Sequence, residues 1–127
     1  MKKLNFGSNK MFNKNKKAGY NGWSNYPTWY MNTYLIEDED QDRLKKFVKD
    51  VLGDEEHDYP EGVLAEALED RAKDIIYNID NAPSDGLAGS LLDYAFGQVE
   101  FYELGYHLYK LSQERGWLTE NDEEDED

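Results

Sequence analysis

The stretch "NGWSNYPTWYMNTYLIEDED" spans residues 21–40 and combines a helix start, a cluster of aromatic residues and a run of four acids. Ser24 or Asn25 can cap the first turn of a helix, because a short polar side chain accepts a hydrogen bond from a free backbone N–H there. Pro27 then falls within the first turn, where its missing N–H costs no intrahelical bond. We therefore expect a helix over residues 26–36.

The aromatic residues of this stretch permit two interpretations. They could stack nucleic-acid bases or hold a peptide, but base-stacking aromatics usually accompany a positively charged groove, and here four acids follow them. A small domain also builds much of its core from aromatic side chains, which bury about 150–250 Å² each. We expect these residues to be core and to fix the first helix onto the domain. They are Trp23, Tyr26, Trp29, Tyr30 and Tyr34.

The pattern stays helical beyond the acids. An amphipathic repeat predicts a helix over residues 40–52, ended by Gly53. Further helices are expected over residues 61–79, 84–98 and 100–115. No long segment alternates with period two, so the predicted fold class is all-α, a compact bundle of about five helices. The apolar residues of the third helix, expected to face inward, are Leu64, Leu68, Ala72, Ile75, Ile76 and Ile79; those of the fourth are Leu87, Leu91, Leu92, Ala95, Phe96 and Val99.

Charge divides the chain unevenly. Residues 1–22 hold six lysines and no acid, whereas residues 23–127 hold the other eight basic residues and all 28 acids, a formal charge of −20. We expect a flexible basic arm over residues 1–20, a helical domain over residues 21–118 and a disordered acidic tail over residues 119–127. The chain has no cysteine and no apolar run of about 20 residues, so we expect neither disulfides nor a membrane span, and a cytoplasmic protein.

Glu66, Asp70 and Asp74 recur at every fourth residue of the third expected helix. Carboxylates one turn apart are about 5–6 Å from each other, and successive phosphates of a DNA strand are separated by a comparable distance. Such a row would attract a basic protein surface built for phosphates. A solvated helix face that only confers solubility is the alternative. The predicted partner-binding acids are Glu37, Asp38, Glu39, Asp40, Glu66, Glu69, Asp70 and Asp74.

The last expected helix carries Tyr102, Tyr106 and Tyr109 beside its apolar stripe. They predict either a half-buried seam or an aromatic contact strip, since tyrosine is favoured in interfaces. A contact strip would permit a homodimer.

Nothing in the sequence indicates catalysis. Glu103 and His107 share one helix face, but a stable metal site needs three or four ligands, and His57 lies in a separate acidic loop. No nucleophile motif, phosphate loop or cysteine–histidine pair occurs. We therefore expect no enzyme, no cofactor and no metal.

Two motifs resemble a family of small proteins of phages, plasmids and other mobile elements. "GWSNYPTW" at residues 22–29 is similar to its W-S-N-Y-E-T-W motif, with Pro27 in place of the family's Glu. "LLDYAFGQVEFYELGYHL" at residues 91–108 is similar to its closing helix pair, with Phe101 in place of a usual Trp. The matching residues of the second motif are Leu91, Leu92, Ala95, Val99, Glu103 and His107.

The resemblance implies a mobile-element origin and a bacterial host cell, but no activity. Acidic proteins of this size and origin are often anti-defence factors, which is an analogy rather than a matched site. Our leading hypothesis is a non-enzymatic inhibitor that binds a basic host protein, such as a nuclease or a CRISPR or restriction component, by imitating DNA charge. The alternatives are a nucleic-acid accessory protein that contacts phosphates through its lysine-rich arm, and a homo-oligomeric adaptor.

Overall fold

The computed structural model describes residues 19–118, and within this range the protein is helical, with one isolated β-bridge between Tyr20 and Trp23. The all-α prediction is confirmed. The predicted arm, apart from Gly19 and Tyr20, and the predicted acidic tail lie outside the described residues. The elements, in chain order, are α1 (Tyr26–Asn32), the π-helical η3 (Thr33–Glu37), α2 (Gln41–Leu52), α3 (Pro60–Lys73), the π-helical η4 (Asp74–Ile79), α4 (Gly86–Gly97) and α5 (Phe101–Glu114).

The first helix begins as its sequence predicts. The Asn25 side chain accepts a hydrogen bond of 2.9 Å from the Thr28 backbone N–H, so Asn25 rather than Ser24 caps α1. Pro27 occupies the first turn. After one π-helical segment, Asp40 caps α2 by accepting a 3.1 Å hydrogen bond from the Arg43 backbone N–H.

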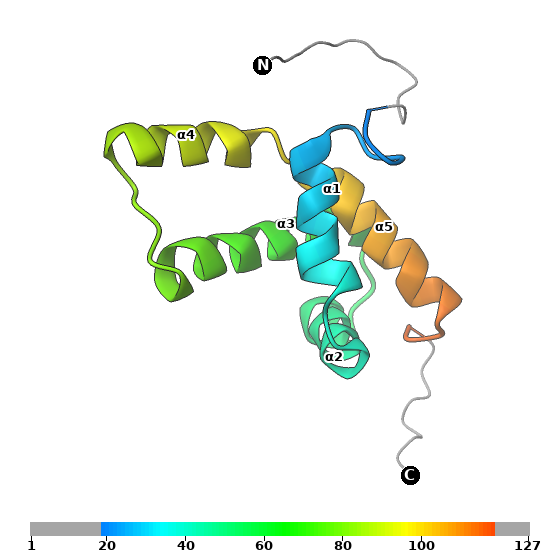
Figure 1. Cartoon of the computed structure of the whole chain (residues 1–127). Helices are drawn as coiled ribbons and strands as arrows, with labels where there is room; N and C mark the ends of the chain where they lie inside the picture. The colour runs from blue at the N-terminus through cyan, green and yellow to red at the C-terminus, as the bar shows by residue number, and fades with distance from the viewer. Residues whose placement is uncertain (1–18, 119–127) are drawn as a thin grey trace.

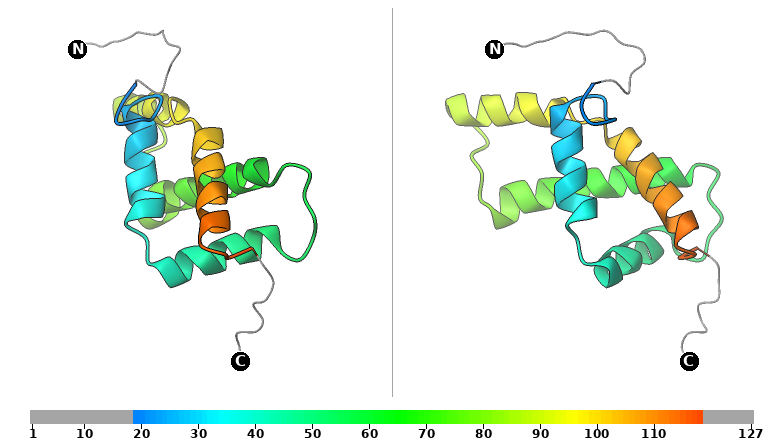
Figure 2. Two further views of the ribbon diagram at one scale, coloured as in Figure 1. Left: turned by 90° about the vertical axis from the view of Figure 1, so that its right-hand side faces the viewer. Right: turned by 45° about the vertical axis from the view of Figure 1, so that its right-hand side comes forward.

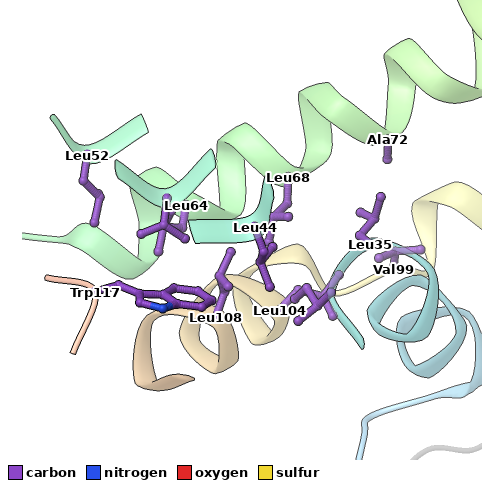
Figure 3. Packing of buried hydrophobic residues seen from close by; sticks show 12 residues of the cluster. Leu35, Leu44, Leu52, Leu64, Leu68, Ala72, Val99, Leu104, Leu108 and Trp117 are labelled. Carbon is purple, nitrogen blue, oxygen red and sulfur yellow. The ribbon is translucent and has the colours of Figure 1, made fainter. Parts of the chain in front are cut away.

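The centre of the domain is α3, which crosses α5, its main packing partner, and also packs against α2 (Figure 1). Gly105 allows the close crossing of α3 and α5, because a Cβ there would lie 2.3 Å from the Glu61 carbonyl oxygen. Leucines fill the space between the helices, and Trp117 closes one end of the cluster (Figure 3). The buried core residues are Leu35, Ile36, Leu44, Val48, Leu52, Leu64, Leu68, Ala72, Val99, Leu104, Leu108 and Trp117.

The aromatic residues of the first helix differ from their prediction as core. Tyr26, Tyr30 and Tyr34 are each about half exposed. The face of α1 and η3 that faces the domain is instead formed by Thr28, Asn32, Leu35 and Ile36, which recur at the spacing of one helix side. Trp23 is partly buried against the core cluster. Trp23 and Trp29 are only partly buried, and the rings of Tyr26 and Tyr30 lie against the Trp29 ring.

The fourth helix forms where it is predicted, as α4, but several of its apolar residues are not covered. Leu87 and Leu91 are exposed, and α4 makes no extended contact with any other described helix. Figures 1 and 2 show α4 projecting from the bundle beyond an extended connection that follows η4. Ile79, at the end of η4, is likewise exposed rather than inward. The sequence pattern predicts this helix correctly. It does not predict that one side of the helix lacks a packing partner.

Across residues 19–118, we find no helix with both the length and the apolar character that crossing a membrane requires.

Candidate functional site: an acidic helix face beside an aromatic hollow

The solvent side of α3 carries a row of acids. Glu66 and Asp70 are exposed on the side of α3 opposite its buried leucines, and the exposed Asp74 follows them at the start of η4. Among the described residues, Glu66 and Asp70 form no ion pair, and Asp74 accepts a hydrogen bond of 2.8 Å from the neutral Asn78 side chain. The described cations therefore leave the charge of this row uncompensated.

Glu69 lies at the edge of this face. Its carboxylate is 3.5 Å from the Lys73 ammonium group, and both side chains are partly exposed. An ion pair of this kind, one helical turn apart in solvent, contributes only about 0.3–0.5 kcal/mol. A cationic partner could therefore compete for Glu69 at little energetic cost.

A hollow lies beside the acidic row, where the start of α3 meets the start of α5. It has a volume of about 490 Å³ and is open to solvent. The rings of Tyr59 and Tyr102 stack at its wall, with centroids 5.7 Å apart and an angle of 22° between planes. The structure thus brings Tyr102 next to Glu66 and Glu69, two of the predicted acids. The lining residues are Tyr59, Gly62, Val63, Ala65, Glu66, Glu69, Phe101 and Tyr102.

The hydroxyl of Tyr102 stays protonated at neutral pH. It donates a hydrogen bond of 3.4 Å to the Glu61 carboxylate. Interaction with the Tyr59 hydroxyl, followed by burial and the negative charge of Glu61, raises the pKa of Tyr102 to about 12. The hollow therefore offers aromatic faces and carboxylates, and this combination binds cations such as an arginine or lysine side chain.

The tyrosine strip of α5 does not act as one surface. Tyr102 and Tyr106 are each about half exposed, but Tyr109 is partly buried against the core cluster. Tyr102 belongs to the hollow described above, and Tyr106 stands outside its lining. The three residues are thus divided among a hollow, the open surface and the core.

The second group of predicted acids lies between η3 and α2. Glu39 is only 18 % exposed and lies 3.9 Å from both Arg43 and Arg71, so two of the protein's own arginines compensate its charge. Asp40 is the cap of α2. Glu37 and Asp38 remain exposed. This group therefore contributes fewer available charges than its sequence suggests.

The residues of the two family-like motifs meet in the fold. The Ser24 backbone N–H donates to the Glu103 carboxylate at 3.2 Å, and the Asn25 side chain donates to the Gln98 carbonyl at 2.8 Å. The Trp23 ring lies edge-on to the His107 ring, with centroids 5.1 Å apart. These contacts hold the start of α1 against the α4–α5 junction. The residues of the two motifs therefore have a structural role in the fold.

His107 and Glu103 do not form a metal site in the described part of the chain. No group of three or more His, Asp or Glu residues within residues 19–118 could hold a metal ion. Burial lowers the pKa of His107, against the opposing charges of Glu37 and Glu114. His57 lies apart from it, with its Nε2 2.7 Å from the Leu52 carbonyl oxygen.

Sequence reasoning missed Tyr59 and Phe101 as parts of the hollow, and Glu61 as the hydrogen-bond partner of Tyr102. Tyr59 precedes α3 and Tyr102 lies in α5, and only the pairing of these two helices brings them together. The available signal was Gly105, whose position on the buried side of α5 permits close contact with α3. Comparisons of the chain with protein-family models, with curated proteins and with solved structures found no match.

Proposed function

We propose that this protein is a non-enzymatic acidic binding protein that occupies the DNA-binding surface of a basic, nucleic-acid-handling protein. The observation that carries the proposal is the uncompensated row of Glu66 and Asp70 on the solvent side of α3 and Asp74 at the start of η4. Glu66 and Asp70 lie on α3, whose other side is buried in the core, and Asp74 begins η4, which continues α3. The charges of the row therefore keep a fixed spacing, as phosphates on a duplex do.

The spacing and the overall charge act together. Carboxylates one turn apart on a helix are about 5–6 Å from each other, so a groove that binds a phosphate row meets charges at similar intervals. The formal net charge of −14 also attracts a basic partner before the two surfaces touch. This attraction raises the association rate at low salt.

The hollow would give the complex specificity beyond charge. Glu66 and Glu69 line it together with the Tyr59 and Tyr102 rings. An arginine or lysine of the partner that inserts there would contact both a carboxylate and an aromatic face, each of which favours a cation. This contact has no counterpart in a row of DNA phosphates. It would fix the orientation of the partner on this protein.

The resemblance to mobile-element proteins suggests what the partner does. A phage or plasmid benefits when host restriction or CRISPR nucleases fail to bind its DNA. We therefore assign the protein to the anti-defence class, as an inhibitor that competes with DNA in the bacterial cytoplasm. This assignment depends on the two motifs and on the acidic row, and on no matched relative.

The test is inhibition of a panel of bacterial restriction and CRISPR nucleases that cleave plasmid DNA, with the full chain added at low and at physiological salt. We expect at least one nuclease to be inhibited, and more weakly at higher salt. The isosteric variant Glu66→Gln/Asp70→Asn/Asp74→Asn should need a roughly tenfold higher concentration for the same inhibition.

The matched control is Asp54→Asn/Glu55→Gln/Glu56→Gln, which removes the same charge from the exposed loop between α2 and α3. Equal weakening by both variants would show that only net charge matters and would contradict a specific row. A panel in which no nuclease is inhibited or bound at low salt would refute the proposal.

A further inference from the structure

The fourth helix is apolar on two opposite sides. Its inner side carries Gly89, Leu92 and Phe96, which are buried or partly buried. Its outer side carries Leu87, Leu91 and Tyr94, which recur at the spacing of one helix face and are 78 %, 62 % and 70 % exposed. A helix that is apolar on all sides is normally covered on all sides. Among the described residues, nothing covers the outer side of α4.

The exposed area suits a protein–protein contact. Large side chains such as these present on the order of 100–150 Å² each, so the three together expose roughly 300–450 Å². Apolar patches much larger than this are rare on monomers, and the largest patch of a monomer is often functional. Two such faces packed together would bury roughly 600–900 Å² in total, which is the size of a small and weak interface.

Charge identifies the occupant. Asp93 is the one charged residue of α4, whereas the body around it is strongly acidic. Two copies of this protein repel each other over most of their surfaces, and α4 is the helix on which that repulsion is least. This face carries little negative charge to attract a basic partner. Such a partner would bind the acidic row instead. The face therefore fits a second copy of this chain better than it fits a basic partner.

We propose that the protein forms a homodimer in which the outer sides of two α4 helices pack antiparallel about a twofold axis near Leu91. In this arrangement Leu91 meets its own copy, and Leu87 of one protomer lies opposite Tyr94 of the other, because the three residues are spaced almost symmetrically. A twofold contact of one patch with itself is the commonest way in which homodimers form. Antiparallel pairing also aligns the helix dipoles favourably.

Sedimentation equilibrium of the full chain tests the association. We expect a dimer that tightens as salt rises, since salt screens the repulsion between two copies of net charge −14. Inhibition of a nuclease through the acidic row should weaken under the same change, so each proposal can fail without the other. Leu91→Glu should raise the dimer dissociation constant on the order of 100-fold, because each of the two protomers places a substituted residue in the contact.

The control is Tyr106→Glu, which adds the same charge at a half-exposed position on α5. It should leave the dimer intact, and circular dichroism should show that both variants remain helical. A dimer lost in Tyr106→Glu but kept in Leu91→Glu would overturn the proposal in favour of the tyrosine strip. A strict monomer at all salt concentrations would also overturn it.

A cross-link provides a second readout that needs no disruptive variant. The chain has no cysteine, so Leu91→Cys introduces a single thiol. Mild oxidation should convert this variant into a disulfide-linked dimer at micromolar concentration, while Tyr106→Cys should stay largely monomeric. Equal cross-linking of the two variants would mean that collisions rather than a defined contact join the chains, and would refute the α4 pairing.

Discussion

The Thr28 hydroxyl accepts a hydrogen bond of 2.9 Å from the backbone N–H of Glu100, 72 residues further along the chain. Thr28 is fully buried in the first turn of α1, and Glu100 immediately precedes α5. One polar contact thus joins the first described helix to the last, at the point where the two motifs meet.

Replacing Thr28 by valine keeps the shape of the side chain and removes the acceptor. Thr28→Val should lower the free energy of unfolding by about 1–3 kcal/mol, because the Glu100 N–H loses its partner in a partly buried position. Urea denaturation followed by circular dichroism measures the change. Thr33→Val is the control, since the Thr33 hydroxyl only donates to the Trp29 carbonyl within its own helix. An equal loss in the control would contradict the importance of the long-range contact.

The crossing of α3 and α5 depends on Gly105. A methyl group there would lie 2.7 Å from the Ala65 nitrogen and 2.3 Å from the Glu61 carbonyl oxygen, both backbone atoms that cannot easily move. Gly105→Ala should therefore lower the free energy of unfolding by about 1–3 kcal/mol or more, measured by thermal and urea denaturation. Gly97→Ala, where a methyl group meets no atom within 4 Å, should be neutral or stabilising.

The partly buried ring of His107 should make stability depend on pH. Its pKa is lowered in the folded protein by burial, so the unfolded chain binds a proton more readily below about pH 6.5. The contribution of the neutral ring is therefore fully present above that pH and is lost as the pH falls toward the folded pKa. The difference in unfolding free energy between wild type and His107→Gln should shrink between pH 7.5 and 5.5. A constant difference would contradict this prediction.

Asn32 is buried in α1, and its Oδ1 atom has no hydrogen-bond partner among the described residues. Asn32→Leu replaces an unpaired polar group by an apolar one of similar size and should raise the free energy of unfolding by about 1 kcal/mol. Asn32→Asp should act in the opposite direction, because it buries an unpaired charge. Chemical denaturation of the two variants beside wild type measures both effects, and a stabilising aspartate would contradict the prediction.

The sequence predicts the helices well where caps and periodicity agree. Asp40 caps α2, and Gly53 ends it with a positive φ of 63°, both as its pattern requires. Leu44, Val48 and Leu52 face inward there because polar residues fill the other side of the helix. A helix with a single apolar face can bury only that face against the core. The pattern of α2 therefore predicts its orientation correctly.

The same reasoning fails where apolar residues lie on more than one side of a helix. Periodicity cannot tell which side of α4 faces the domain, since Leu91 and Phe96 are equally apolar and only Phe96 faces inward. The tyrosines of α1 mislead for a related reason, because a hydroxyl-bearing ring is stable half-exposed. The hollow depends on a pairing of distant helices, which no local pattern specifies.

The fastening of α1 to the α4–α5 junction has a consequence for how the protein is made. Residues 23–28 leave the ribosome long before residues 98–107, which supply their partners. The first helix must therefore wait, without its anchor, until most of the domain has been synthesised. The anchor of α1 is therefore completed only once α5 has been synthesised.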